Sequence, residues 1–163
     1  MNPAPIPDSW LDPQADGAAL EVEQFPGVLM LAVSTLYQRN IFKPLLDAHG
    51  IGVADWRVLL SLNHYGEATA ADIVSRSWMD KAQVSRAVLT LGAAGLIDTR
   101  PDPEHARRVL LRSTRSGSAL YRKLLAQSRC EQARMLGKLS PAERRGLYQA
   151  LQKVLAYVQA SGA

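Results

Sequence analysis

Two closely spaced helix-start signals in the middle of the chain constrain its fold more than any other feature. Thr69 precedes Asp72 by three residues, and Asp80 precedes Gln83 by the same interval. In each pair the first side chain can accept a hydrogen bond from a backbone amide that the new helix leaves unpaired, and the second can reach back to the amide of the first. The pattern predicts two short helices, each beginning at one of these pairs and joined to the other by a tight turn.

A change of hydrophobic period follows these helices. Residues 96–100 and 107–112 are short β-prone runs on either side of a proline- and acid-rich turn, which predicts a β-hairpin. With the two helices expected over residues 69–77 and 80–94, the order is helix, turn, helix, hairpin. That order is a winged helix-turn-helix, in which the second helix lies in the major groove of DNA.

Helical periodicity also flanks this segment. One helix is expected over residues 21–48 with a kink at Pro44, because proline removes a backbone donor. Residues 1–20 hold four of the nine prolines and are expected to form an extended, flexible arm. The fold class predicted is therefore mainly α, of α+β type, with a two-stranded β wing. The other helices expected span residues 52–65 and 114–138, and one begins at the Ser140–Glu143 pair.

The charge is unevenly distributed along the chain. The net charge is +4, yet residues 1–50 carry −4, from two basic and six acidic residues. Residues 100–123 carry +5, from seven basic and two acidic residues. A basic stretch in a near-neutral protein suits a polyanion such as double-stranded DNA, although a solvated charged surface gives the same pattern.

The second helix of the pair has one apolar face and one polar face. Val84, Ala87, Val88 and Leu91 recur at helical spacing and are expected to pack inward. A glutamine can bond adenine through two atoms, and an arginine can do the same with guanine. Leu89 is apolar on this outward side, and we expect it to pack on the wing or on a neighbour. The outward residues predicted to bind DNA are Lys81, Gln83, Ser85, Arg86 and Thr90. For any one of them taken alone, an ordinary position on a solvent-facing helix surface is an equally good explanation.

Residues 50–117 resemble the core of the MarR (multiple antibiotic resistance regulator) family. The resemblance is strongest where Leu91 is followed by Gly95 and Leu96 before the wing, and where Thr114 is followed by Gly117 after it. The other matching segments are 50–51, 56–59, 71–74, 80–86 and 107–111.

The resemblance implies a homodimeric transcription regulator, with a helical dimerisation region at residues 21–48 and 115–160 and a DNA-binding domain at residues 50–114. It also implies a roughly palindromic operator and release from DNA by a small aromatic or lipophilic molecule. By the same resemblance, Arg107 or Arg108 lies near the wing tip and enters the minor groove. His105 stands where the family usually has an aspartate that pairs with the wing arginine, so this salt bridge is expected to be absent or to be replaced by one from Asp102 or Glu104.

A ligand pocket is expected where the first two helices meet the start of the helix after Thr114. The residues predicted to line it are Tyr37, His49, Trp56 and Arg57, a mixture of aromatic and polar side chains typical of small-molecule sites. For Trp56, a position in the hydrophobic core, packed inward with Leu59 and Leu60, is at least as good an explanation as ligand binding.

Other functions find little support in the residues. No metalloprotease, phosphate-loop, dinucleotide or serine-hydrolase motif occurs, so neither an enzyme nor a cofactor is expected. The three histidines lack metal-ligand spacing, and Cys130 is expected to be a small packed residue. No segment predicts a secretion signal or a membrane span, which favours the cytoplasm. The alternative left open is a winged-helix module for protein–protein contacts without DNA binding.

Overall fold

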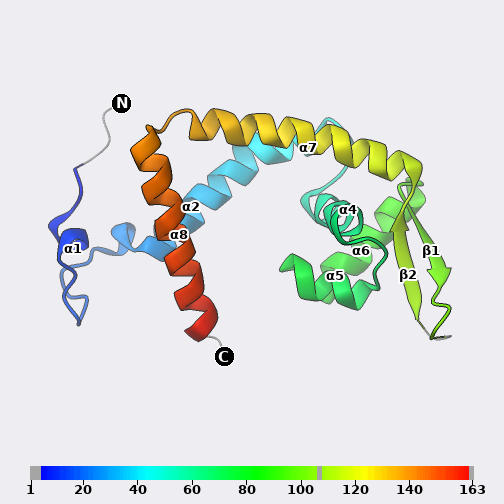
Figure 1. Cartoon of the computed structure of the whole chain (residues 1–163), viewed down its shortest axis with the longest axis horizontal. Coiled ribbons are helices and arrows are strands. Elements are labelled where there is room, and N and C mark those ends of the chain that lie inside the picture. Colours follow the sequence, from blue (N-terminus) through cyan, green and yellow to red (C-terminus); the bar gives the residue numbers. More distant parts are fainter. Residues whose placement is uncertain (1–4, 106–107, 162–163) are drawn as a thin grey trace. The chain divides into compact units, whose positions relative to one another are not determined.

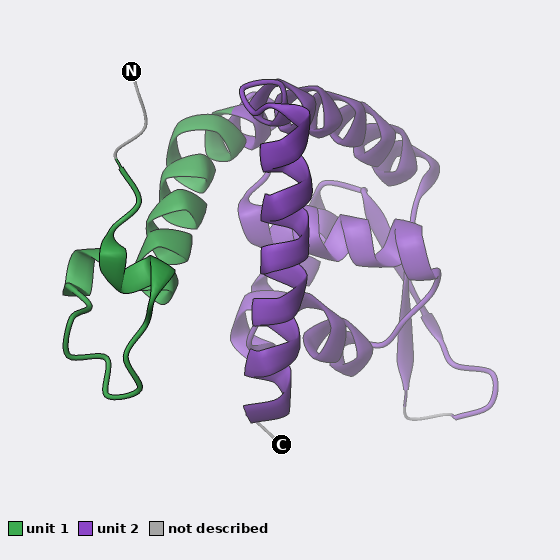
Figure 2. Cartoon of the chain, turned by 60° about the vertical axis from the view of Figure 1, so that its left-hand side comes forward, with its two compact units in different colours: residues 1–44 green, residues 45–163 purple. Residues whose placement is uncertain are grey.

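The computed structural model describes residues 5–105 and 108–161, which fall into two compact units, residues 1–44 and 45–163 (Figure 2). The first unit is helical but more broken than the sequence predicts. Its elements are α1 (Asp8–Leu11), the 3-10 turn η1 (Val22–Gln24), α2 (Pro26–Tyr37), the π-helical turn η2 (Gln38–Phe42) and the start of α3 (Lys43–Asp47).

The prediction of one helix over residues 21–48 was therefore wrong in detail. Phe25 is extended, and Pro26 begins α2 at the position where a missing N–H costs nothing. Pro44 cannot donate to the carbonyl of Asn40, and the turn just before it widens, so that the Lys43 N–H donates to Gln38, five residues back. The helix therefore changes locally from α to π just before the proline.

The expectation of an extended arm over residues 1–20 was also wrong in part. Asp8–Leu11 form α1, and the indole N–H of Trp10 donates to the carbonyl oxygen of Gln24 at 2.9 Å. This bond ties α1 to η1, because the indole nitrogen is a donor that needs an acceptor.

The second unit contains the helix-turn-helix and the hairpin, and its mainly helical winged-helix fold is confirmed (Figure 1). The helix-start signals form the predicted bonds. The Asp72 N–H donates to the Thr69 hydroxyl at 3.2 Å, and the Gln83 N–H donates to the Asp80 carboxylate at 2.7 Å. The elements are α4 (Val53–Tyr65), α5 (Ala70–Ser77), α6 (Lys81–Ala93), β1 (Ile97–Pro101), β2 (Val109–Ser113), α7 (Arg115–Leu136) and α8 (Pro141–Ser161).

The core of this unit joins α4, α5, α6 and the wing. Strands β1 and β2 pair antiparallel, and Ala68 adds a bridge to Leu111 on the other edge of β2. Leu60 was predicted to point inward but is 36% exposed, because the buried face of α4 is formed by Leu59 and Leu62 on either side of it. The largest fully buried side chains are Leu46, Val58, Leu59, Ile73, Val84, Leu91 and Leu124.

The junction between the wing and α7 explains the glycine at position 117. The Thr114 hydroxyl donates to the carbonyl of Gly95 at 2.9 Å and accepts from the Gly117 N–H at 3.0 Å, while the Thr114 N–H donates to the carbonyl of Leu96. Gly117 lies directly against that Leu96 carbonyl, where a side chain has no room. The threonine and the glycine therefore join the end of α6 to the start of α7.

Candidate nucleic-acid interface

Helix α6 is divided lengthwise into a buried stripe and an exposed face. Val84, Ala87 and Leu91 are buried at a spacing of three and four residues, and Val88 is half-buried beside them. The buried stripe fixes the rotation of the helix about its axis, and so decides which residues face outward. All five residues of α6 that were predicted to bind DNA are exposed: Lys81, Gln83, Ser85, Arg86 and Thr90.

These residues are not equally available to a base. The Oε1 atom of Gln83 accepts the Asp80 N–H at 3.1 Å as part of the helix cap, and Thr90 donates its hydroxyl to the carbonyl of Arg86. To bond adenine through both atoms of its amide, Gln83 has to release the Asp80 N–H that it accepts in the helix cap. Within residues 5–105 and 108–161, the guanidinium of Arg86 has no hydrogen-bond or ion-pair partner. Within these residues, Arg86 is therefore free of intramolecular bonds that a guanine contact would have to replace.

Leu89 corrects one expectation from the sequence. It was predicted to pack on the wing or on a neighbour, but it is 71% exposed. The reason is its angular position, since it lies on the side of α6 opposite the buried stripe. An apolar side chain at this place can contact the C5-methyl group of thymine.

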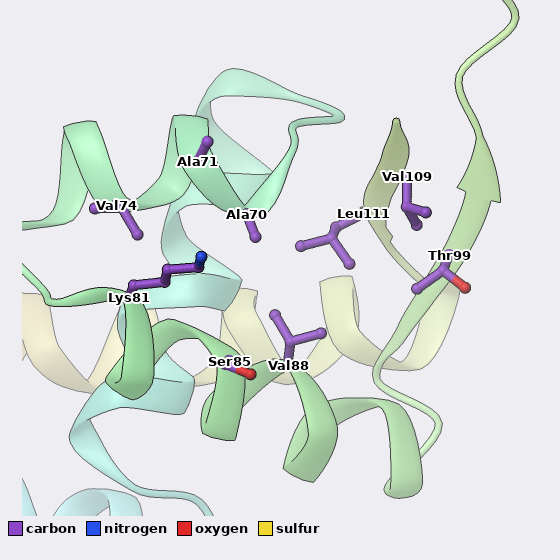
Figure 3. A pocket seen from close by; sticks show the side chains of 9 residues that line it. All are labelled: Ala70, Ala71, Val74, Lys81, Ser85, Val88, Thr99, Val109 and Leu111. Carbon is purple, nitrogen blue, oxygen red and sulfur yellow. The ribbon is translucent and has the colours of Figure 1, made fainter. Parts of the chain in front are cut away.

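A groove of about 540 Å³ separates α6 from the wing and α5 (Figure 3). Lys81, Ser85 and Val88, one turn apart on α6, line one side of it. Ala70, Ala71 and Val74 of α5 and Thr99, Val109 and Leu111 of the wing line the rest. Lys81 and Ser85 therefore face the wing side of α6, whereas Gln83 and Thr90 lie on its other flank.

Two ion pairs involve the strands of the wing. The guanidinium of Arg100 on β1 bonds the carboxylate of Glu67, through Nε at 3.0 Å and through a second, shorter contact. This hydrogen bond is the main reason why the pKa of Glu67 lies below its usual value and the pKa of Arg100 above its own. Arg112 pairs with Asp98 across the strands at 3.5 Å. Both pairs are substantially exposed, so they orient the hairpin more than they stabilise it.

The wing tip is closed by Asp102. Its backbone N–H donates to the carbonyl of Arg108 at 2.9 Å, and its carboxylate accepts the N–H of Glu104 at 2.9 Å. Asp102 thus shapes the turn through the backbone. Arg107, which was predicted to bind DNA, lies outside the described residues.

Arg108 is exposed and lies near the start of α5. Together with Val109 and residues 69–72 it lines a smaller hollow. Hydrogen bonds from the Thr69 hydroxyl and the Thr69 N–H lower the pKa of Asp72, and the charges of Arg76 and Arg108 lower it further. A cation at this place suits a phosphate of the DNA backbone.

The predicted ligand-binding residues divide between the two units. In the second unit, Trp56 is 6% exposed and stacks on Tyr121 of α7 with ring centres 5.6 Å apart. His49 Nε2 lies 3.3 Å from Oε1 of Gln127, also on α7, and Arg57 is half-buried. These contacts give Trp56 a core role.

Tyr37 belongs to the first unit, where its ring stacks on Phe42. The pocket that joins Tyr37 to the other three residues stays a prediction.

Comparisons with known proteins agree with this geometry. The model of the MarR family matches residues 49–108. The HTH-type transcriptional repressor IacR of Pseudomonas putida is 31% identical over 116 residues, which are 71% of this chain and 68% of IacR. The HTH-type transcriptional repressor NicR of the same species is 28% identical over 97 residues, 60% of this chain and 61% of NicR.

A solved structure extends the agreement to the fold. The structure of Bordetella bronchiseptica BpsR, whose DNA binding is regulated by 6-hydroxynicotinic acid, covers 83% of this chain and 96% of its own, with a TM-score of 0.73 and 25% identity.

The exposed polar side chains of α6 beside the hairpin match the arrangement of a winged-helix transcription regulator. The chain belongs to the MarR family, and it is a regulator, not an enzyme. Within the described part of the chain, no helix combines the length and apolar character needed to cross a membrane.

Proposed function

We propose that the protein is a repressor that binds a roughly palindromic operator as a homodimer in the cytoplasm, and that a small aromatic or lipophilic molecule releases it. The observation that carries the proposal is the exposed face of α6, where Arg86 lies between the flanks that carry Ser85 and Gln83. The repressor role is supported by the names of IacR and NicR.

Exposed apolar side chains support the homodimer. Helix α8 buries none of its described residues, and its stripe Leu147, Leu151, Leu155 and Val158 is 43–58% exposed. Helix α2 exposes a second set, which includes Leu31 at 67%. Apolar surface this extensive on a small protein marks an interaction site. In this proposal the dimerisation region comprises residues 21–48 and 115–160, and the DNA-binding domain residues 50–114.

Selection of bound sequences from random duplex DNA tests the proposal. We expect a palindromic motif whose half-site centres lie about 10 base pairs apart, because a two-fold dimer places its two recognition helices one helical turn apart. Enrichment of no motif, together with weak binding of all duplexes, would favour the alternative of a winged-helix module for protein contacts.

Arg86→Ala should relax base preference at one position in each half-site. Loss of a two-atom guanine contact costs about 1–3 kcal/mol, and the loss should appear on the preferred base only. The control is Arg108→Ala, in which a cation near the wing tip is removed. We expect this control to weaken binding to all sequences alike and to lower the salt slope by about one unit per subunit. Titrations on operator duplexes substituted at that position distinguish the two patterns; equal weakening by Arg86→Ala on every duplex contradicts base reading.

The proposed effector site is formed by Tyr37, His49, Trp56 and Arg57. The regulation of BpsR by 6-hydroxynicotinic acid supports an aromatic acid as the first probe. His49 and Arg57 would add polar groups to the aromatic side chains of Tyr37 and Trp56, a mixture typical of sites that bind such molecules.

Addition of hydroxynicotinic or hydroxybenzoic acid should weaken the protein–operator complex, and Arg57→Ala should reduce this response while operator affinity without the acid is kept. The measurement is fluorescence anisotropy of a labelled operator against acid concentration. A wild-type complex that resists both aromatic acids and lipophilic compounds would remove the effector from the proposal.

A further inference from the structure

Trp78 occupies the turn between α5 and α6 in a backbone conformation that is unfavourable for a bulky residue. Its φ is 55° and its ψ is 30°, in the left-handed region that glycine adopts without penalty. Among residues 5–105 and 108–161 it is the one non-glycine residue with a positive φ. The adjacent Met79 is 5% exposed and anchors the turn in the core, so the chain turns outward at Trp78.

The indole itself packs on almost nothing. Trp78 is 86% exposed, whereas Trp56 is 6% exposed against Tyr121 and Trp10 donates its N–H to Gln24. In the described part of the chain the N–H of Trp78 has no acceptor. A strained backbone that presents a tryptophan ring and its N–H to solvent is explained by a partner outside the chain more readily than by folding.

The position of the turn indicates which partner this is. Trp78 lies two residues before Asp80, the N-cap of α6, and the N-terminal end of a recognition helix is the end that enters the major groove. The sugar–phosphate backbone passes along the edges of that groove, and phosphate oxygens accept hydrogen bonds from the side chains that position a protein on DNA.

We propose that Trp78 contacts the DNA backbone at the edge of the groove that α6 enters, with its indole N–H donating to a phosphate oxygen and its ring covering the adjoining deoxyribose. The inference rests on the proposed function, since it requires α6 to lie in the groove. It assigns Trp78 to positioning, because backbone contacts carry no sequence information.

Two variants test the inference. Trp78→Gly suits the left-handed conformation and should unfold at the same temperature as the wild type or higher. It should nevertheless bind the operator at least about tenfold more weakly, the effect of one hydrogen bond to a charged group. Binding to unrelated duplex DNA should weaken by the same factor. Trp78→Phe keeps a ring and the same turn but has no N–H, so its affinity should lie between those of the wild type and Trp78→Gly.

Tryptophan fluorescence gives an independent measurement. Operator DNA should change the emission of the wild type, and this change should be absent in Trp78→Phe, which keeps Trp10 and Trp56. The inference is overturned if Trp78→Gly binds as tightly as the wild type, if its loss is confined to the operator, or if light scattering shows that its oligomeric state has changed. Failure of the wild type to bind any duplex would instead overturn the proposed function.

Discussion

Replacement of Gly117 by alanine is expected to destabilise the protein by about 3 kcal/mol, at the upper end of the range for overpacked positions. The added Cβ would lie 1.9 Å from the carbonyl oxygen of Leu96 and 2.8 Å from the hydroxyl oxygen of Ser113. The Leu96 carbonyl cannot easily move, because it accepts the N–H of Thr114 at 3.0 Å. Thermal unfolding at a fixed protein concentration should show a fall in Tm of roughly 6–12 °C for a domain of this size.

Gly92→Ala is the matched control for this prediction. Gly92 lies inside α6 with no atom within 4 Å of an added Cβ, so alanine meets no obstacle there. Because alanine is the better helix former by about 1 kcal/mol, the Tm of Gly92→Ala should be unchanged or raised. A Gly117→Ala protein that unfolds at the wild-type temperature would show that the contact between α7 and the wing is looser than the structure has it.

Leu151→Asp in α8 is expected to give a monomer and to reduce operator affinity by about two to four orders of magnitude, the usual gain from linking two binding modules. Leu151 is 45% exposed in the middle of the apolar stripe of α8, where a partner chain is proposed to cover it. Burial of an unpaired carboxylate in such an interface is strongly unfavourable, so the two chains should separate. Light scattering measures the mass of the assembly, and anisotropy with operator DNA measures the affinity.

Gln149→Asp provides the control, since it introduces the same charge on the opposite, polar side of α8. Gln149 is exposed and lies about half a turn from the stripe, so its replacement should leave both the mass and the affinity unchanged. A Leu151→Asp protein that stays dimeric would mean that α8 is not the dimer interface. A monomer that still binds the operator tightly would mean that one recognition helix is sufficient.

The local hydrogen-bonding patterns were predicted correctly from the sequence. The pairs Thr69–Asp72 and Asp80–Gln83 form the expected caps, and the β-prone runs pair as a hairpin. These features depend on residues within a few positions of one another, so local sequence is sufficient to specify them. The π-helical turn before Pro44 was not predicted, because whether a proline kinks a helix or changes its type depends on how the backbone before it adapts.

Only part of the candidate site could be predicted from the sequence. Periodicity placed Arg86 on the outward face of α6, but it could not reveal that Gln83 already bonds Asp80 or that Leu89 is left uncovered. Nothing in the residue type of Trp78 indicates a left-handed backbone, since the conformation follows from burial of Met79 on one side of a tight turn.

The caps, the helix–turn–helix–hairpin order and the amphipathic face of α6 follow from local sequence, because each arises from contacts within one or two turns of chain. The need for a glycine at position 117 and the pairing of Arg100 with Glu67 follow from tertiary contacts, because both depend on segments brought together by folding. Thr114 illustrates the division. Its capping of α7 is local, but its bond to Gly95 exists only because the hairpin returns the chain to the end of α6.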